Sequence, residues 1–266
     1  MIVHILDRLE EPYGAVGWTK CGGCDYRDHC MTKADNDQDV ALLYDLDQGL
    51  ARRLRENGIV TIKELVDTYD AESLSELKRP WGAREKKVGK KAASLLRQAN
   101  AILAKKEIVI KKPDLPFSKN YAMFDIAGLP PQLDERDKIY LWGMQVFGEN
   151  PGRFRYSLAE PGRDGDRACW EQFLTVANEI LTAYGDVPFV YWYRSEKIRI
   201  NAYVKRYGDR AGIAANVASR LVDLLPITRN AVVLPELSYS LKVVEKYIGF
   251  KRSHDEYGGE RSIAQY

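Results

Sequence analysis

The sequence predicts an α/β protein in which a mixed sheet with flanking helices follows a small all-α domain. A length of 266 residues is enough for one large domain or two small ones, each with its own core. From residue 120 onward, three strand-like apolar runs precede an amphipathic segment and a fourth strand, which is typical of mixed α/β domains. Residues 38–106 instead have the spacing of short helices.

The first 37 residues form a separate short segment. A few apolar residues lead into a Gly-rich cysteine cluster, and a polar stretch over residues 33–37 follows. This is too little chain to form a core alone.

Residues 38–106 predict helices joined by glycine-containing turns. Asn57-Gly58 marks the end of a helix, because both residues tolerate the left-handed conformation. Thr61 opens the next helix with Glu64 in a capping-box position. Residues 80–82 predict a second turn, and residues 92–104 a helix with one apolar stripe. The pattern is that of a helix-hairpin-helix segment.

Residues 107–119 predict an extended linker, because Pro113 and Pro116 disfavour a helix there. The remaining residues, 120–266, predict one domain. Its expected strands are residues 121–126, 139–147, 154–159 and 187–192. Its expected helices are residues 170–184, 196–207, 211–225 and 240–247.

The composition excludes several protein classes. No apolar run approaches the roughly 20 residues of a membrane-spanning helix. The first apolar patch carries Asp7, Arg8, Glu10 and Glu11, unlike a secretory signal. Four cysteines are too few for a disulfide scaffold in a chain of this length. We therefore expect a cytoplasmic protein without membrane association.

The charge is distributed unevenly along the chain. The span 78–119 holds 13 Lys and Arg against 3 Asp and Glu, a net charge of +10. The whole chain carries +2, so the remainder carries −8. Such a basic block is either a footprint for phosphate or a solvated helix followed by a charged linker. The candidate nucleic-acid-binding residues in it are Lys86, Lys87, Lys90, Lys91 and Arg97.

The segment Phe124-Asp125-Ile126-Ala127-Gly128 resembles the first motif of DEDD-type exonucleases, in which a strand presents Asp-x-Glu to two metal ions. Alternate strand residues share a face, so positions 125 and 127 would belong to one site. Two-metal phosphodiester hydrolysis needs several carboxylates to hold the ions. Ala127 stands at the Glu position and cannot bind metal, so the resemblance implies a weak or inactive enzyme. The alternative is an incidental Asp at a strand end.

Later residues extend this resemblance. Glu196 follows the fourth strand, where the second carboxylate motif of such exonucleases falls, although a carboxylate at a helix N-terminus is also explained by the helix dipole. Asp223 either lines the site or ends a helix. Lys242 and Tyr239 either contact substrate phosphate or pack their helix. The resemblance implies Asp125 and Glu196 as ligands of Mg²⁺ or Mn²⁺ and Asp223 as a supporting catalytic residue.

The cysteines at Cys21, Cys24 and Cys30 have the spacing C-x2-C-x5-C. They resemble the last three cysteines of RecB-type nucleases that hold a 4Fe–4S cluster, but no upstream cysteine supplies a fourth ligand. One alternative is Zn²⁺ with His29 or His4 as the fourth ligand, and another is an unmetallated trio. Cys169 falls in an amphipathic helix and is expected to be a small buried residue.

The order of these parts resembles the C-terminal half of a RecB-like nuclease family. The resemblance implies a RecB-type remnant over residues 1–37, a helix-hairpin-helix domain over 38–106, and a truncated RNase H-like exonuclease domain over 120–266. It implies 3′–5′ exonuclease-like, metal-dependent hydrolysis of nucleic acid, with DNA in preference to RNA. The alternatives are a non-catalytic DNA- or RNA-binding module and a fragment of a larger nuclease.

Overall fold

The computed structural model describes residues 13–17, 21, 24–129, 137–160, 163–193 and 195–252. The chain forms two compact units. The first unit comprises Met1–Lys111 with Val232–Val243, and the second comprises Lys112–Ala231 with Val244–Tyr266. The sequence did not indicate that residues 232–243 return to the first unit.

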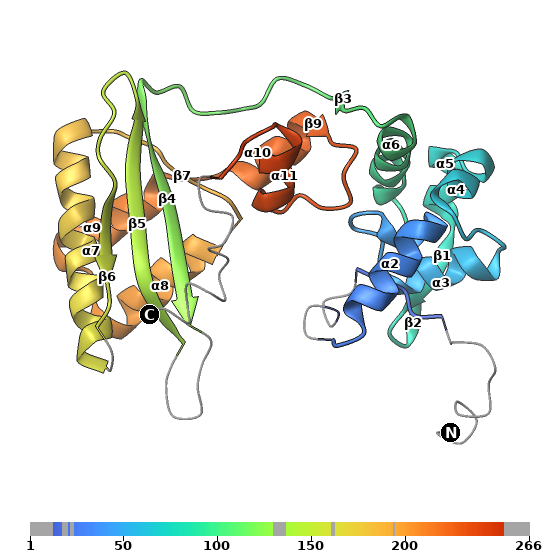
Figure 1. Cartoon of the computed structure of the whole chain (residues 1–266), viewed down its shortest axis with the longest axis horizontal. Helices are drawn as coiled ribbons and strands as arrows, with labels where there is room; N and C mark the ends of the chain where they lie inside the picture. The colour runs from blue at the N-terminus through green and yellow to red at the C-terminus, as the bar shows by residue number, and fades with distance from the viewer. Residues whose placement is uncertain are drawn as a thin grey trace. The chain divides into compact units, whose positions relative to one another are not determined.

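The first unit consists mainly of short helices (Figure 1), several of which have side-chain caps. Asp47 accepts a hydrogen bond from the Leu50 N–H at the start of α3, and Thr61 and Glu64 form the expected capping box on α4. The helical elements are α2 (Arg27–Asp37), η2 (Val40–Leu42), α3 (Gln48–Glu56), α4 (Ile62–Thr68), α5 (Ala71–Glu76) and α6 (Lys91–Ala104).

The prediction of an all-α domain is wrong at one place. Residues 78–87 form an antiparallel hairpin of β1 (Lys78–Trp81) and β2 (Arg84–Lys87), with Trp81 opposite Arg84. Gly82 has φ +61°, as the two-residue turn of a hairpin requires. Pro80 lacks the N–H that a helix needs, and α6 begins only after Gly89. The basic residues are therefore divided between a strand and a helix.

The core of the first unit packs α2 together with the later helices. Leu54, Ile62, Leu65 and Leu74 are fully buried, and Ala34 of α2 packs in the same cluster. The segment predicted to be a plain linker begins with β3 (Ile108–Val109), which pairs antiparallel with β9 (Val232–Val233). This pairing explains how the late segment joins the first unit.

The second unit has the predicted α/β architecture. Its five-stranded sheet has the order β6-β5-β4-β7-β8. The first three strands along the chain pair antiparallel, whereas β7 and β8 run parallel to β4. The strands are β4 (Asn120–Leu129), β5 (Lys138–Gly148), β6 (Arg155–Leu158), β7 (Phe189–Tyr191) and β8 (Leu221–Asp223). The helices are α7 (Arg163–Tyr184), α8 (Ser195–Tyr207), α9 (Ile213–Ser219) and α10 (Leu224–Ala231), and α11 (Leu241–Tyr247) follows later.

The single helix predicted over residues 211–225 is wrong. The chain there forms a 3₁₀ turn (Arg210–Gly212), then α9, the strand β8, and the start of α10. Leu221, Val222 and Asp223 pair in parallel with β7. A strand of three residues is too short for hydrophobic periodicity to distinguish it from a helix.

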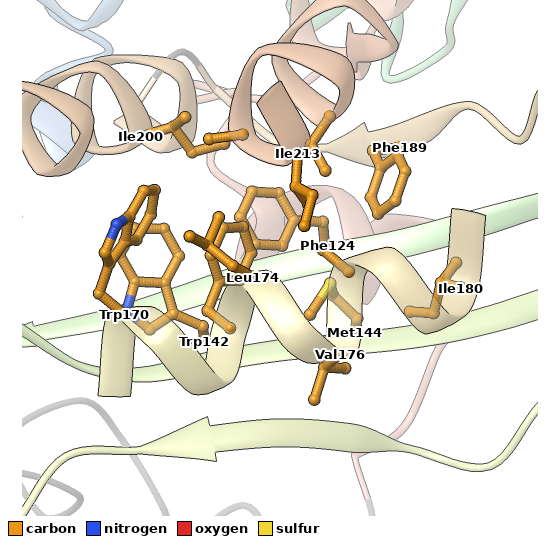
Figure 2. Close-up of a cluster of buried hydrophobic side chains, with 14 of the residues drawn as sticks. Phe124, Trp142, Met144, Trp170, Leu174, Val176, Ile180, Phe189, Ile200 and Ile213 are labelled. Atoms are coloured by element: carbon orange, nitrogen blue, oxygen red, sulfur yellow. The ribbon is translucent and has the colours of Figure 1, made fainter. Parts of the chain in front are cut away.

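Aromatic side chains fill the core of the second unit. Figure 2 shows Phe124, Trp142 and Trp170 packed between the strands and the helices. The rings of Trp142 and Phe173 have centroids 4.5 Å apart. Cys169 is buried as predicted, and burial raises the pKa of its thiol to about 11. This core fixes the helices against one face of the sheet.

A buried carboxylate ties α7 to α8. Asp166 accepts hydrogen bonds from the hydroxyl groups of Tyr203 (2.5 Å) and Tyr207 (2.7 Å). The Arg206 guanidinium donates to the same carboxylate at 2.9 Å. Burial and the Asp166 charge raise the pKa of Tyr203 well above its usual range. Because all three partners lie on α8, this network holds that helix in place.

Among the described residues, no helix is long and apolar enough to cross a membrane.

Replacing the buried Asp166 by Asn is expected to lower the free energy of unfolding by about 3 kcal/mol, because it leaves the partly buried Arg206 guanidinium without its counter-charge. Urea denaturation measures the loss. The matched control is Asp164→Asn, an exposed residue in the same turn of α7, with a change below about 0.5 kcal/mol. Equal stability of the two variants would contradict the role of Asp166.

Candidate functional site

Three carboxylates lie where parallel strands end. Met123 of β4 pairs with Val190 of β7, and Tyr191 of β7 pairs with Asp223 of β8. Asp125 follows two residues after Met123, and Glu196 lies in the first turn of α8, directly after β7. The carboxyl ends of parallel strands meet at one edge of a sheet, which is where α/β proteins place their ligands. The three predicted acidic residues therefore converge at this edge.

Asp125 lies on the sheet face opposite the core. Ala122 and Phe124 are buried, whereas Met123 and Asp125 alternate with them and are exposed. The surrounding protein still raises the pKa of the Asp125 carboxyl by desolvation, and the charge of Glu245 raises it further. The backbone N–H of Ile126 and the charge of Arg252 act in the opposite direction. Asp125 is thus an exposed carboxylate whose pKa is raised by the surrounding protein.

Glu196 has the most perturbed carboxyl group of the edge. Its side chain belongs to a residue that is only 3% exposed, and the Ser195 hydroxyl donates to its Oε2 at 2.8 Å. Burial raises its pKa to about 7, against the opposing effect of its hydrogen bonds. The negative charges of Asp125 and Asp223 raise it further. The three residues therefore interact electrostatically, although they are far apart in the sequence.

Asp223 ends β8 rather than a helix. Its Oδ1 accepts hydrogen bonds from the backbone N–H groups of Tyr193 and Leu225, both at 3.0 Å. Tyr193 has φ +76°, a conformation uncommon for a bulky residue. Asp223 therefore holds the segment after β7 and starts α10, which is a positioning role that sequence reasoning did not anticipate.

The position of Ala127 is next to a sheet irregularity. The β4–β5 pairing shifts between Ala127 and Gly128, as at a β-bulge. Ala127 is half-buried and packs against the core cluster. Bulges commonly redirect side chains beside active sites. No carboxylate is available at this position.

Sequence reasoning also missed Tyr191. This buried residue ends β7, and burial together with the charges of Asp223 and Glu196 raises the pKa of its hydroxyl to about 12. Tyr191 stays neutral at physiological pH and adds no further charge to the edge. Its position near the end of the expected strand before Glu196 could have marked Tyr191 as a neighbour of the site.

The carboxylates of this edge do not by themselves assemble a metal-binding group in the described part of the chain. Among the described residues, no three His, Cys, Asp or Glu side chains form a group that could hold a metal ion. Asp125 and Glu196 supply two carboxylates whose raised pKa values a nearby cation would lower. Asp223 is engaged by two backbone N–H groups, and Ala127 contributes nothing. These side chains do not provide the set of carboxylates with which DEDD-type exonucleases hold two metal ions.

The cysteines lie in the first unit. Cys21 and Cys30 are half-buried and Cys24 is exposed, with Cys30 packed against the core cluster. His29 lies on α2, and His4 lies outside the described residues. The described part of the chain contains no metal-binding group around them. The iron–sulfur or zinc site therefore remains a prediction.

The predicted basic residues are exposed and belong to the first unit. Lys86 and Lys87 lie on β2, and Lys90, Lys91 and Arg97 lie at or within α6. Lys87 forms an ion pair with Glu76 of α5. Lys242 is exposed on α11. Their contact with nucleic acid remains a prediction.

Because the folded pKa of Glu196 is near 7, above its ordinary value, native Glu196 binds its proton more tightly than the unfolded chain does. Wild-type stability should therefore fall as pH rises from about 4.5 to about 7. Glu196→Gln lacks this titration, so its stability relative to wild type should improve by roughly 3 kcal/mol between pH 4 and pH 8.

Urea denaturation at both pH values checks this expectation. The control is Glu171→Gln, an exposed residue on α7. Parallel pH dependence of wild type and Glu196→Gln would show that Glu196 titrates normally.

Comparisons with known proteins give the family of this fold. The comparison with curated proteins finds no match for the chain. The family model described as the RNase H superfamily matches residues 122–266, more than half of the chain, including Asp125, Glu196 and Asp223. The chain therefore belongs to the RNase H superfamily.

Proposed function

We propose that the second unit is a metal-dependent nuclease module with low activity, whose site is the sheet edge at Asp125 and Glu196. Membership of the RNase H superfamily points to nuclease-like processing of nucleic acid. The observation that carries the proposal is the placement of Asp125, Glu196 and Asp223 at the carboxyl ends of parallel strands. The pKa of Glu196, raised mainly by burial and further by the charges of Asp125 and Asp223, agrees with it. Perturbed carboxyl groups gathered at a strand edge are typical of functional sites.

Each residue has a distinct role in this proposal. Asp125 and Glu196 would hold Mg²⁺ or Mn²⁺, which supplies positive charge for a phosphodiester oxygen when bound. Asp223 positions the segment between β7 and α8 through its two backbone hydrogen bonds. Ser195 donates to Glu196 and favours its ionised form. The absence of a carboxylate at Ala127 limits the number of ions held and accounts for the low activity.

The finer assignments rest on the order of the sequence motifs. We propose 3′–5′ exonuclease-like hydrolysis with a preference for DNA, since the motif at Asp125 resembles that of DEDD-type exonucleases. Kinship with RecB-like nucleases and a helix-hairpin-helix origin of the first unit are proposed on the same ground.

Adding the missing carboxylate should increase cleavage. Wild type is expected to degrade a labelled single-stranded oligonucleotide slowly in Mn²⁺, and Ala127→Glu should do so at least about tenfold faster, because an extra ligand strengthens ion binding and charge stabilisation. Gel analysis of time courses gives the rates. Ala127→Gln is the matched control, since it adds the same volume without charge.

The negative control is Asp125→Asn, which should abolish the residual cleavage. Robust cutting by wild type that survives Asp125→Asn would refute the assignment. A gain in Ala127→Gln equal to that in Ala127→Glu would show that charge is not the cause.

Cation binding can be tested without catalysis. At pH 7.5, Mn²⁺ should raise the Tm of wild type, because a ligand that binds only the folded state stabilises it. Asp125→Asn should lose this shift, whereas Asp114→Asn, which alters an exposed carboxylate of the same unit, should retain it. Equal shifts in all three proteins would place the bound ion elsewhere.

A second function, a non-catalytic nucleic-acid-binding module, is favoured by Ala127 and by the engagement of Asp223 in backbone hydrogen bonds. It predicts salt-sensitive binding of nucleic acid with no Mn²⁺-dependent cleavage, even in Ala127→Glu. The cleavage and Tm measurements together separate the two functions.

A further inference from the structure

The β1–β2 hairpin places a large aromatic side chain in solvent. Trp81 pairs with Arg84 directly beside the two-residue turn. Trp81 is 52% exposed. A tryptophan normally buries most of its surface, so this exposure needs an explanation. The hairpin belongs entirely to the first unit, whereas the residues assigned to the nuclease edge belong to the second unit.

The ring of Trp81 is held by cations of the same hairpin. The guanidinium carbon of Arg79 lies 4.8 Å from the ring centroid, and Lys86 Nζ lies 5.1 Å from it. Both distances fit cation–π contacts. Arg79 is itself buried and pairs with Asp47 at 2.7 Å. The ring is thus exposed and fixed, as a stacking surface should be.

The hairpin is also anchored to α3. A Cβ at Gly49 would lie 2.2 Å from the Pro80 carbonyl oxygen, so only glycine permits this close approach. Glu85 pairs with Arg53 of α3 at 3.0 Å. A hollow of about 490 Å³ opens between these elements, and its lining includes Arg52, Trp81 and Gly82. This volume is within the range of small-ligand sites.

Several cations around the ring are not neutralised. In the part of the chain that the structure describes, no carboxylate forms an ion pair with three exposed residues beside Trp81: Arg52, Arg84 and Lys86. The acidic neighbours Glu76 and Glu85 are already paired with Lys87 and Arg53. The surface therefore carries uncompensated positive charge beside an exposed ring.

We propose that this hairpin binds a single-stranded segment of nucleic acid, with a base stacked on Trp81 and phosphates contacted by Arg84 and Lys86. Stacking requires an unpaired base, because bases in a duplex already stack on one another. Positive charge around an aromatic ring is the recurring design of single-strand binding surfaces. The inference takes its ligand class from the proposed function, but it does not require catalysis.

Binding in EDTA tests the hairpin independently of cleavage. Fluorescence anisotropy of the full chain with labelled 20-mers of dT and of U measures affinity for single-stranded DNA and RNA. Trp81→Leu should weaken binding of both by at least about fivefold, the lower end expected for loss of one stacked base. Trp81→Phe keeps a ring and should stay within about threefold of wild type. The matched control is Phe117→Ala, which removes an exposed aromatic residue outside the hairpin.

The salt dependence tests the cations. Arg84→Gln with Lys86→Gln should reduce the slope of log affinity against log salt concentration by roughly 1.4, since each single-strand phosphate contact contributes about 0.7. Lys205→Gln, an exposed residue of α8, should leave the slope unchanged.

The outcomes separate this inference from the proposed function. Unaltered binding by Trp81→Leu, or equally tight binding of a blunt duplex, would overturn the hairpin proposal and leave the nuclease edge untouched. Failure of wild type to bind either oligonucleotide would overturn the ligand class itself. Measured Tm values establish that Trp81→Leu and Trp81→Phe are folded, and loss of binding confined to the leucine variant supports stacking.

Discussion

The parallel pairing of β4, β7 and β8 is the constraint on which the candidate site depends. It brings Asp125, Glu196 and Asp223 from three separate stretches of chain to one edge of the sheet. Burial raises the pKa of Glu196 to about 7, with a smaller contribution from the negative charges of Asp125 and Asp223. Burying a carboxylate beside other negative charges destabilises the fold, and such an arrangement is typical of functional sites. A divalent cation would offset the negative charge of these carboxylates.

The rest of the second unit keeps that edge in place. The aromatic core fixes β4 and β5 against α7, while the Asp166 network holds α8, on which Glu196 lies. Asp223 accepts hydrogen bonds from two backbone N–H groups, that of Tyr193 after β7 and that of Leu225 in the first turn of α10. The groups that stabilise the second unit therefore also fix the geometry of the site.

Much of the second unit could be predicted from the sequence, because long strands and the amphipathic α7 have clear periodicity. The positions of Asp125 and Glu196 could also be predicted, because each follows the end of an expected strand. The strand β8 could not be predicted, since three residues carry no period, and neither could the β3–β9 pairing, which joins segments over 120 residues apart. The β1–β2 hairpin could not be predicted, because its mostly charged, exposed strands show no apolar alternation. Its turn depends on the positive φ of Gly82. Asp223 was predicted to support the site, but its backbone partners were set by the fold.

Charge coupling between Asp125 and Glu196 is measured most directly by a carbon-13 NMR titration of the Glu196 side-chain carboxyl. The midpoint in wild type should lie near 7. In Asp125→Asn it should move downward, because a neighbouring negative charge has been removed. A wild-type midpoint near the ordinary glutamate value, or one unchanged by Asp125→Asn, would contradict the account.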